Sequence, residues 1–251
     1  MKRKIILTLA LSLIFCAVAS SQSSTPLALP KLSIEVGKAT KPDDVSMTLQ
    51  ILFLMTILSL APALLILTTA FTRIIVVLHF LKQAMGTPQM PPPQILLGLA
   101  MFLTFFVMAP VWNKVNDDAL QPYMKNKITV SAAYDKAIIP IKEFMFRQTR
   151  EEDLALFVQL SKMDKPNNRN DIPIHVLIPS FAISELRMGF QMGFVLFVPF
   201  LIIDMVVASI LMAMGMMMLP PGMVSLPFKI LLFILVDGWH LVIGSIVSSF
   251  H

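Results

Sequence analysis

Residues 179–222 read PSFAISELRMGFQMGFVLFVPFLIIDMVVASILMAMGMMMLPPG, and this stretch decides the fold of the chain. Between Met188 and Leu219 its only formal charge is Asp204. A helix needs about 20 apolar residues to cross the hydrocarbon of a bilayer, so this run is long enough to span one. Soluble cores rarely contain such a run, which indicates a membrane protein.

The composition of the whole chain points the same way. Hydrophobic residues make up 56% of the 251 residues, and the mean hydropathy is +0.77. These values place the chain among membrane proteins and argue against a soluble globular fold. Apolar segments separated by breaks rich in proline and glycine predict an all-α fold with about four long apolar helices and one polar helical region.

A small set of charged residues lies in and beside the apolar segments: Glu185, Arg187, Asp204, Lys229 and Asp237. An ionised side chain in hydrocarbon costs about 2.5–3.5 kcal/mol, so these groups should face protein or water and have partners. We predict that Glu185 pairs with Lys229. In the alternative, Glu185 and Arg187 lie at the membrane interface and only anchor the helix there.

A methionine run stands before two prolines, and it consists of Met214, Met216, Met217 and Met218. Methionine is unbranched and polarizable, so several at one level can conform to an irregular partner or close a hole. Pro220 and Pro221 are expected to end the preceding helix. Because a narrow apolar constriction excludes water and ions, the run predicts a gate, although methionine can also simply fill gaps between helices.

Glycine and proline positions predict how the apolar helices pack and bend. Gly189 and Gly193 form a small-xxx-small pair, which lets another helix approach closely. Pro62 and Pro199 are expected to kink their helices, because proline removes a helical hydrogen bond. In the last apolar segment, Asp237 and His240 could relay protons, but a structural hydrogen bond is the commoner use of such residues.

The N-terminal residues resemble a targeting signal. Basic residues at 2–4, an apolar run at 5–18 and small residues at Ala17 and Ala19 are typical of a secretory signal peptide, with cleavage after Ala19. The alternative is an uncleaved first helix. Cleavage would remove the single cysteine, Cys16. Residues 20–46 are polar and contain proline, and they predict a flexible lead with a short strand at 32–36.

Breaks and charges divide the rest of the chain. Arg73 and Lys82 give the side of the proline-rich loop at 82–94 two bases and no acid, which favours the cytoplasm for that loop. The following polar region is then periplasmic, and we expect two amphipathic helices there, with a capping box at Thr149–Glu152. The predicted parts are a cleavable signal peptide at 1–19, a flexible lead at 20–46, a hydrophobic helical hairpin at 47–111, a periplasmic helical region at 112–178 and a second hydrophobic hairpin with a Met-rich loop at 179–251.

The sequence shows no catalytic signature. It has no phosphate-binding glycine loop, and the histidines at 79, 175, 240 and 251 lack the spacing of metal ligands. The basic residues are spread out instead of forming a stripe that would bind nucleic acid. We therefore expect no catalytic, cofactor or metal site and no nucleic-acid partner.

Several long blocks of this sequence resemble the FliP/SctR family, the export-gate proteins of flagellar and virulence type III secretion systems. The two main blocks are Pro179–Phe194 and Pro199–Met217. Shorter ones are RIIVVL at 73–78, GTP at 86–88, LGLAMFLTFF at 97–106 and MMLPPGMVSLPFK at 217–229. The resemblance covers about residues 46–250.

The resemblance implies an oligomeric helical assembly of bent hairpins at the bacterial inner membrane and the periplasmic side of the flagellar basal body. Several copies of the chain would join FliQ and FliR partners and other export-apparatus membrane proteins. Neighbouring subunits, together with some membrane lipid, would cover the apolar surface. Unfolded flagellar proteins would pass through this gate, and Met214–Met218 would lie at its pore and keep it closed.

Other functions remain open from the sequence. One is the export gate of a virulence system, although the signal and long lead resemble the flagellar branch. Another is an ion- or proton-coupled carrier whose relay would use Glu185, Asp204, Asp237 and His240. A third is a purely structural membrane anchor of the basal body.

Overall fold

The computed structural model describes residues 42–87, 90–163, 166, 168–216 and 218–250, without the side chains of residues 42–48 and 170. The predicted signal peptide, most of the predicted lead with its strand, and Met217 lie outside the described residues.

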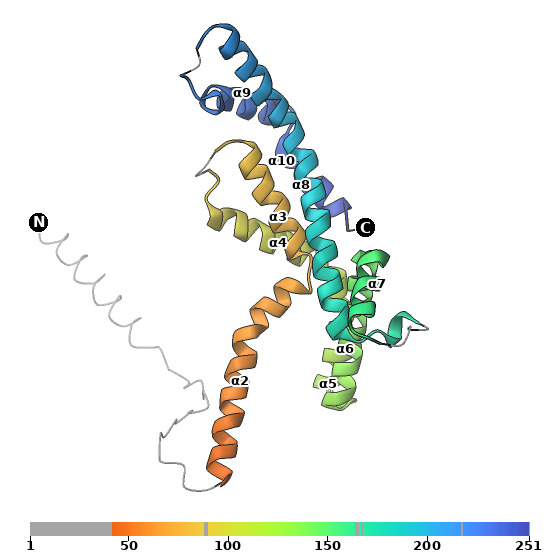
Figure 1. Cartoon of the computed structure of the whole chain (residues 1–251). Helices are drawn as coiled ribbons and strands as arrows, with labels where there is room; N and C mark the ends of the chain where they lie inside the picture. Colours follow the sequence, from red (N-terminus) through yellow and green to blue (C-terminus); the bar gives the residue numbers. More distant parts are fainter. Residues whose placement is uncertain (1–41, 88–89, 164–165, 167, 217, 251) are drawn as a thin grey trace, which may run out of the picture. The chain divides into compact units, whose positions relative to one another are not determined.

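In this described part every regular element is a helix, so the all-α prediction is confirmed (Figure 1). The elements are α2 (Pro42–Leu67), α3 (Phe71–Ala84), α4 (Pro93–Val115), the π-helical turn η1 (Asn116–Leu120), α5 (Gln121–Met124), α6 (Val130–Gln148), α7 (Glu151–Leu160), the 3₁₀ turn η2 (Arg169–Asp171), α8 (Ile174–Ala213), α9 (Pro221–Leu235) and α10 (Gly238–Ser248).

Three helical segments of the described chain are long and apolar enough to cross a membrane: Leu49–Leu67, Pro93–Met124 and Ile174–Ala213. The pair α9 and α10 could form a fourth span, but it is bent by 65°. The predicted last segment is therefore two helices, joined at Asp237, whose φ of 49° is left-handed. A residue in this conformation cannot continue an α-helix, which explains the bend.

The proline predictions need one correction. Pro62 lies inside α2 and Pro199 inside α8, and a separate break interrupts the first apolar segment at 68–70. Pro220 and Pro221 do not end α8, which stops at Ala213. They are the N-cap and first residue of α9, where proline lacks only an amide that would have no helical partner. Kinks at Pro62 and Pro199 stay predictions.

Gly215 explains why α8 stops seven residues before the first of these prolines. Its φ is +74°, and its N–H donates to the carbonyl of Met212 at 3.0 Å. The N–H of Met216 donates to the carbonyl of Leu211 at 2.9 Å. Together these bonds make a Schellman motif, the common glycine-dependent end of a helix.

The core forms around α3, which packs mainly on α8 and also on α4. Ile74, Val77 and Leu78 of α3 are fully buried. Gly189 and Gly193 of α8 face this helix: a Cβ at Gly189 would lie 3.0 Å from Val76, and one at Gly193 would lie 2.5 Å from the Phe80 ring. The two glycines therefore allow α3 and α8 to approach closely, as small residues do between membrane helices.

The polar region contains the two expected amphipathic helices, α6 and α7, both of which pack on α8. The predicted capping box is wrong. The N-cap of α7 is Arg150, and the hydroxyl of Thr149 donates to the carbonyl of Met145 at 2.7 Å, inside the preceding helix. The N–H of Arg150 donates to the hydroxyl of Ser184 on α8 at 3.1 Å, so a tertiary contact takes the place of a local cap.

Candidate functional site

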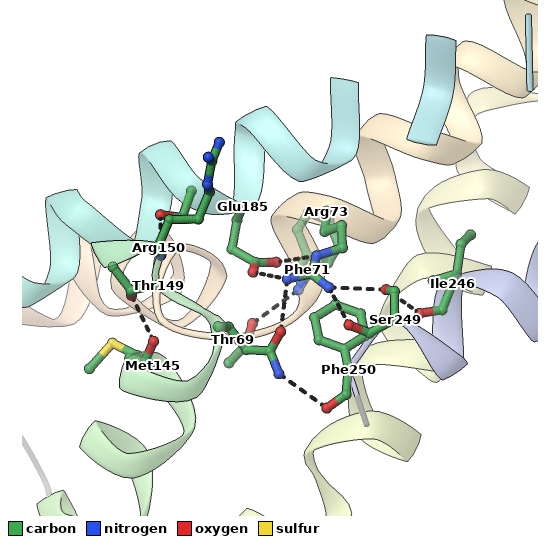
Figure 2. A network of polar contacts seen from close by, with 12 residues as sticks. Thr69, Phe71, Arg73, Met145, Thr149, Arg150, Glu185, Ile246, Ser249 and Phe250 are labelled. Atoms are coloured by element: carbon green, nitrogen blue, oxygen red, sulfur yellow. Dashed lines mark hydrogen bonds and ion pairs between the residues drawn. The ribbon is translucent and has the colours of Figure 1, made fainter. Parts of the chain in front are cut away.

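The guanidinium of Arg73 forms a buried ion pair with Glu185 (Figure 2). Its Nε–H donates to Oε2 of Glu185 at 3.0 Å, and its Nη2 donates to Oε1. The two side chains are exposed by only 1% and 0%. Bidentate pairing of this kind fixes both position and orientation, so it locks α3 to α8.

The other donors of Arg73 reach further elements. Nη2 donates to Oε1 of Gln148 at 3.0 Å, and Nη1 donates to the carbonyl and hydroxyl of Ser249 at 2.8 and 3.0 Å. The ring of Phe250 lies 4.0 Å from the guanidinium carbon. All five N–H groups of the guanidinium are thus used. We call these five residues (Arg73, Gln148, Glu185, Ser249 and Phe250) the Arg73 cluster; it joins α3, α6, α8 and the residues after α10.

The predicted pairing of Glu185 with Lys229 is wrong in this chain. Glu185 pairs with Arg73, and Lys229 pairs with Asp204. The reason is that α3 lies directly against α8 and brings its own base to Glu185. A signal for this was present in the sequence, since Arg73 is the only formal charge between Met47 and Leu81 and itself required a partner.

Lys229 of α9 is the centre of a second cluster. It is 4% exposed, and its Nζ donates to Oδ2 of Asp204 at 2.6 Å. The hydroxyl of Ser225 donates to Oδ1 of the same carboxylate at 2.5 Å. A Cβ at Gly86 would lie 3.6 Å from Nζ, so the end of α3 also comes near. This Lys229 cluster (Asp204, Ser225 and Lys229) fastens α9 to α8.

Arg187 belongs to a third set of contacts, with α7. Its Nη2 lies 3.2 Å from Oδ1 of Asp153, whose side chain is almost fully buried, and its Nη1 lies 3.5 Å from Glu152. The hydroxyl of Ser184 donates to Oδ2 of Asp153 at 2.8 Å. Arg187 is itself partly exposed, so it joins α8 to α7 at the surface and not within the core.

Asp237 is placed differently from the other charged residues. It is exposed at the joint between α9 and α10 and is no member of a buried ion pair in the described chain. His240 is exposed as well. The four groups of a possible relay are therefore divided, with Glu185 in the Arg73 cluster and Asp204 in the Lys229 cluster.

The methionine run forms the connection between α8 and α9. Met214, Met216 and Met218 are exposed by 66%, 43% and 98%, while Met217 is outside the described residues. The Schellman motif at Gly215 fixes where the loop leaves α8, and the Lys229 cluster holds the two helices together below it. The arrangement thus presents soft apolar side chains at the tip of an anchored hairpin.

The buried polar side chains of the described chain are all paired. None of its buried side-chain nitrogen or oxygen atoms lacks a hydrogen-bond partner. Among the same residues, no group of three or more histidine, cysteine, aspartate or glutamate side chains is placed to hold a metal ion. The buried carboxylates therefore act as fixed partners of arginine, lysine and serine.

Comparison with known proteins gives the family. The model of the FliP family matches residues 54–246. The chain is 57% identical over 217 residues to the flagellar biosynthetic protein FliP of Bacillus subtilis, covering 86% of this chain and 98% of that protein. It is 52% identical over 206 residues to the protein of the same name from Pectobacterium carotovorum, covering 82% and 80% of the two chains.

A more distant relative supports the same conclusion over nearly the whole length. The flagellar biosynthetic protein FliP of Borreliella burgdorferi is 43% identical over 243 residues, covering 95% of this chain and 94% of that protein. The resemblance seen in the sequence is thus confirmed. The chain belongs to the FliP family.

Proposed function

We propose that this protein is a pore-forming core subunit of the flagellar type III export gate, through which unfolded flagellar proteins cross the bacterial inner membrane. Its relatives are named as flagellar biosynthetic proteins, which favours the flagellar system over a virulence system. The observation that carries the pore-forming role is the exposure of Met214, Met216 and Met218 at the tip of the α8–α9 hairpin.

The gate depends on the flexibility of these methionine side chains. Thioether side chains have several rotatable bonds, so a ring of them can close around an empty axis and reshape around a passing polypeptide. A closed apolar ring excludes water and ions without any hydrogen bond. The hairpin below the tip is held by the Lys229 cluster, which keeps the ring at one level while its side chains move.

Further copies of the chain, FliQ-like and FliR-like subunits and other export-apparatus membrane proteins are the proposed partners. The support is the apolar surface that the chain leaves open. None of the apolar window in α2 is buried, and only 11% of the window in α8 is. In the gate this surface is covered mainly by neighbouring subunits at the inner membrane and its periplasmic side, and by membrane lipid where no neighbour covers it.

We infer that the protein is not an enzyme. The carboxylates that a relay or a hydrolytic site would need hold fixed structural partners: Glu185 with Arg73, Asp153 with Ser184 and Asp204 with Lys229. Energy for export is then supplied by other subunits or by the proton gradient.

The test substitutes glutamine, similar in size but polar, for the exposed methionines. Met214→Gln, Met216→Gln and Met218→Gln are combined in flagellated cells, and ion leakage across the inner membrane is measured. The matched control is Met205→Gln, because Met205 is 63% exposed on α8 but lies away from the tip. We expect leakage only from the triple variant.

Leakage from neither variant, with flagellar export intact, would support a structural anchor and contradict the gate. A second measurement separates the gate from a carrier. Native mass of the complex extracted in mild detergent should show several copies of the chain, whereas a single copy that transports ions alone would contradict the proposal.

A further inference from the structure

The helix α10 is attached to the rest of the chain at its two ends and through Val242 and Ile246 in its middle, and a hollow lies beside these two residues. We propose that α10 together with Ser249 and Phe250 is a strap. Its far end, Ser249–Phe250, detaches from the Arg73 cluster while the ion pair between Arg73 and Glu185 stays closed. This conformational change goes beyond the proposed export function and does not depend on it.

The N-terminal end of the strap, at Gly238, is a rigid bend between α9 and α10. The left-handed φ of Asp237 turns the chain, and α9 and α10 meet at 65°. Gly238 is buried under the ring of Phe233, where an added Cβ would lie only 2.2 Å from ring carbons. The same ring meets Trp239 edge to face at 5.5 Å between centroids. This packing keeps the first turn of α10 in place.

The far end is held by polar contacts and one aromatic ring (Figure 2). Ser249 accepts two hydrogen bonds from Nη1 of Arg73, at its carbonyl and its hydroxyl. The carbonyl of Phe250 accepts from Nε2 of Gln148 at 3.1 Å. The ring of Phe250 lies against the Arg73 guanidinium and is stacked on Phe144, with centroids 6.3 Å apart.

One face of the middle of the strap is buried in the core, where Val242 and Ile246 are 2% and 0% exposed, but the packing beside them is interrupted. A hollow of about 230 Å³ lies between α3, α8 and α10, and its lining includes Val77, Leu196, Val242 and Ile246. Atoms that border a hollow lack partners on one side and lose dispersion attraction. The outer face of α10 is open, with Leu241 58% exposed. The attachment of α10 to the rest of the chain therefore depends on Val242, Ile246 and its far end.

The two ways of opening the Arg73 cluster differ in cost. Separating Arg73 from Glu185 leaves two buried charges without their partner, which is strongly unfavourable. Detaching Ser249–Phe250 keeps that pair and the hydrogen bond from Arg73 to Gln148. It gives up the hydrogen bonds to Ser249 and Phe250 and the contacts of the Phe250 ring, each of which is worth less than the buried ion pair. Local opening occurs first where its free energy is lower, so the strap detaches before the ion pair separates.

Hydrogen exchange of the full chain in mild detergent, followed by mass spectrometry, tests this. Phe250→Ala removes the ring from the far end, and Phe102→Ala is the control because Phe102 is 77% exposed on α4. We expect Phe250→Ala to speed exchange in residues 238–250 by at least tenfold. Exchange in α3 and α8 should change by less than about twofold. The control variant should leave the exchange rates of residues 238–250, α3 and α8 unchanged.

Equal acceleration in α3, α8 and α10 would show that Phe250 is an ordinary core residue and would overturn the proposal. Unchanged exchange in residues 238–250 would overturn it too. If Phe250→Ala does not fold, Phe250→Leu takes its place, since leucine keeps much of the apolar bulk but lacks the ring face. The expected pattern is the same, with a smaller acceleration confined to residues 238–250.

Discussion

Arg73 and Glu185 are 112 residues apart in the sequence, yet their side chains form a bidentate ion pair that is almost completely buried. The pair joins α3 to α8, because Arg73 lies on α3 and Glu185 on α8. Removing one partner of a buried pair leaves the other charge uncompensated, so this contact makes the sharpest prediction about stability.

Glu185→Gln should destabilise the chain by about 3–5 kcal/mol, because Arg73 keeps its charge in a buried site. The midpoint of thermal unfolding in detergent should fall by about 10 °C for a chain of this size. The control is Glu152→Gln, since Glu152 is 72% exposed and pairs only at the surface. The double variant Arg73→Met with Glu185→Leu should lose less than Glu185→Gln alone. An equal or greater loss would mean that the charges themselves stabilise the site.

Asp204→Asn should weaken the attachment of α9 to α8, since Lys229 would keep its charge at 4% exposure and lose its ionised partner. A loss of about 1–3 kcal/mol is expected for a charged hydrogen-bonded group of this kind. Hydrogen exchange across residues 221–235 measures it. Glu143→Gln is the control, because its pair with Lys114 is exposed on both sides. Equal effects of the two substitutions would show that the Lys229 pair is no stronger than a surface contact.

Gly193→Ala should push α3 and α8 apart, because the new Cβ would lie 2.5 Å from the Phe80 ring. Overpacking of this kind costs about 1–3 kcal/mol. Gly98→Ala, where a Cβ meets nothing within 4 Å, should instead be neutral or stabilising. A double-mutant cycle with Phe80→Ala checks the cause. If the two losses simply add, the glycine does not act through this ring.

Gly215→Ala should strain the end of α8, because the φ of +74° is unfavourable for a residue with a side chain. The cost is roughly 1–2 kcal/mol, and the methionine loop should exchange its amides faster. Gly222→Ala serves as the control, since it lies in α9 and a Cβ there meets nothing within 4 Å. Identical stabilities of the two variants would show that the Schellman motif contributes little.

The helical class and the apolar segments could be predicted from the sequence because they depend on local composition and period. The lone charge of Arg73 showed that it needs a partner, but not that the partner is Glu185. That choice depends on which face of α3 meets α8, and the fit of Val76 and Phe80 against Gly189 and Gly193 sets that register. The sequence shows the glycines but not the ring that fills the space above them.

The predicted end of α8 was wrong for a different reason. Proline is a visible helix breaker, so Pro220 was predicted to stop the helix, whereas Gly215 does so earlier. Glycine just after the last helical turn is itself a stop signal and could have been used. The bend at Asp237 had no comparable signal, because aspartate is only an occasional residue in left-handed backbone and its neighbours continue the apolar pattern.

The continuity of α8 has a consequence for how the protein meets the lipid. Its 40 residues rise about 60 Å at 1.5 Å per residue, roughly twice the hydrocarbon thickness of a bilayer. Along this rod Glu185 and Asp204 are separated by about 28 Å, close to one hydrocarbon thickness. If the acyl chains occupied the interval between these two carboxylates, the turns beyond each of them would protrude. No upright placement lets the bilayer alone cover α8, and in the proposed assembly neighbouring subunits would cover the apolar length that remains.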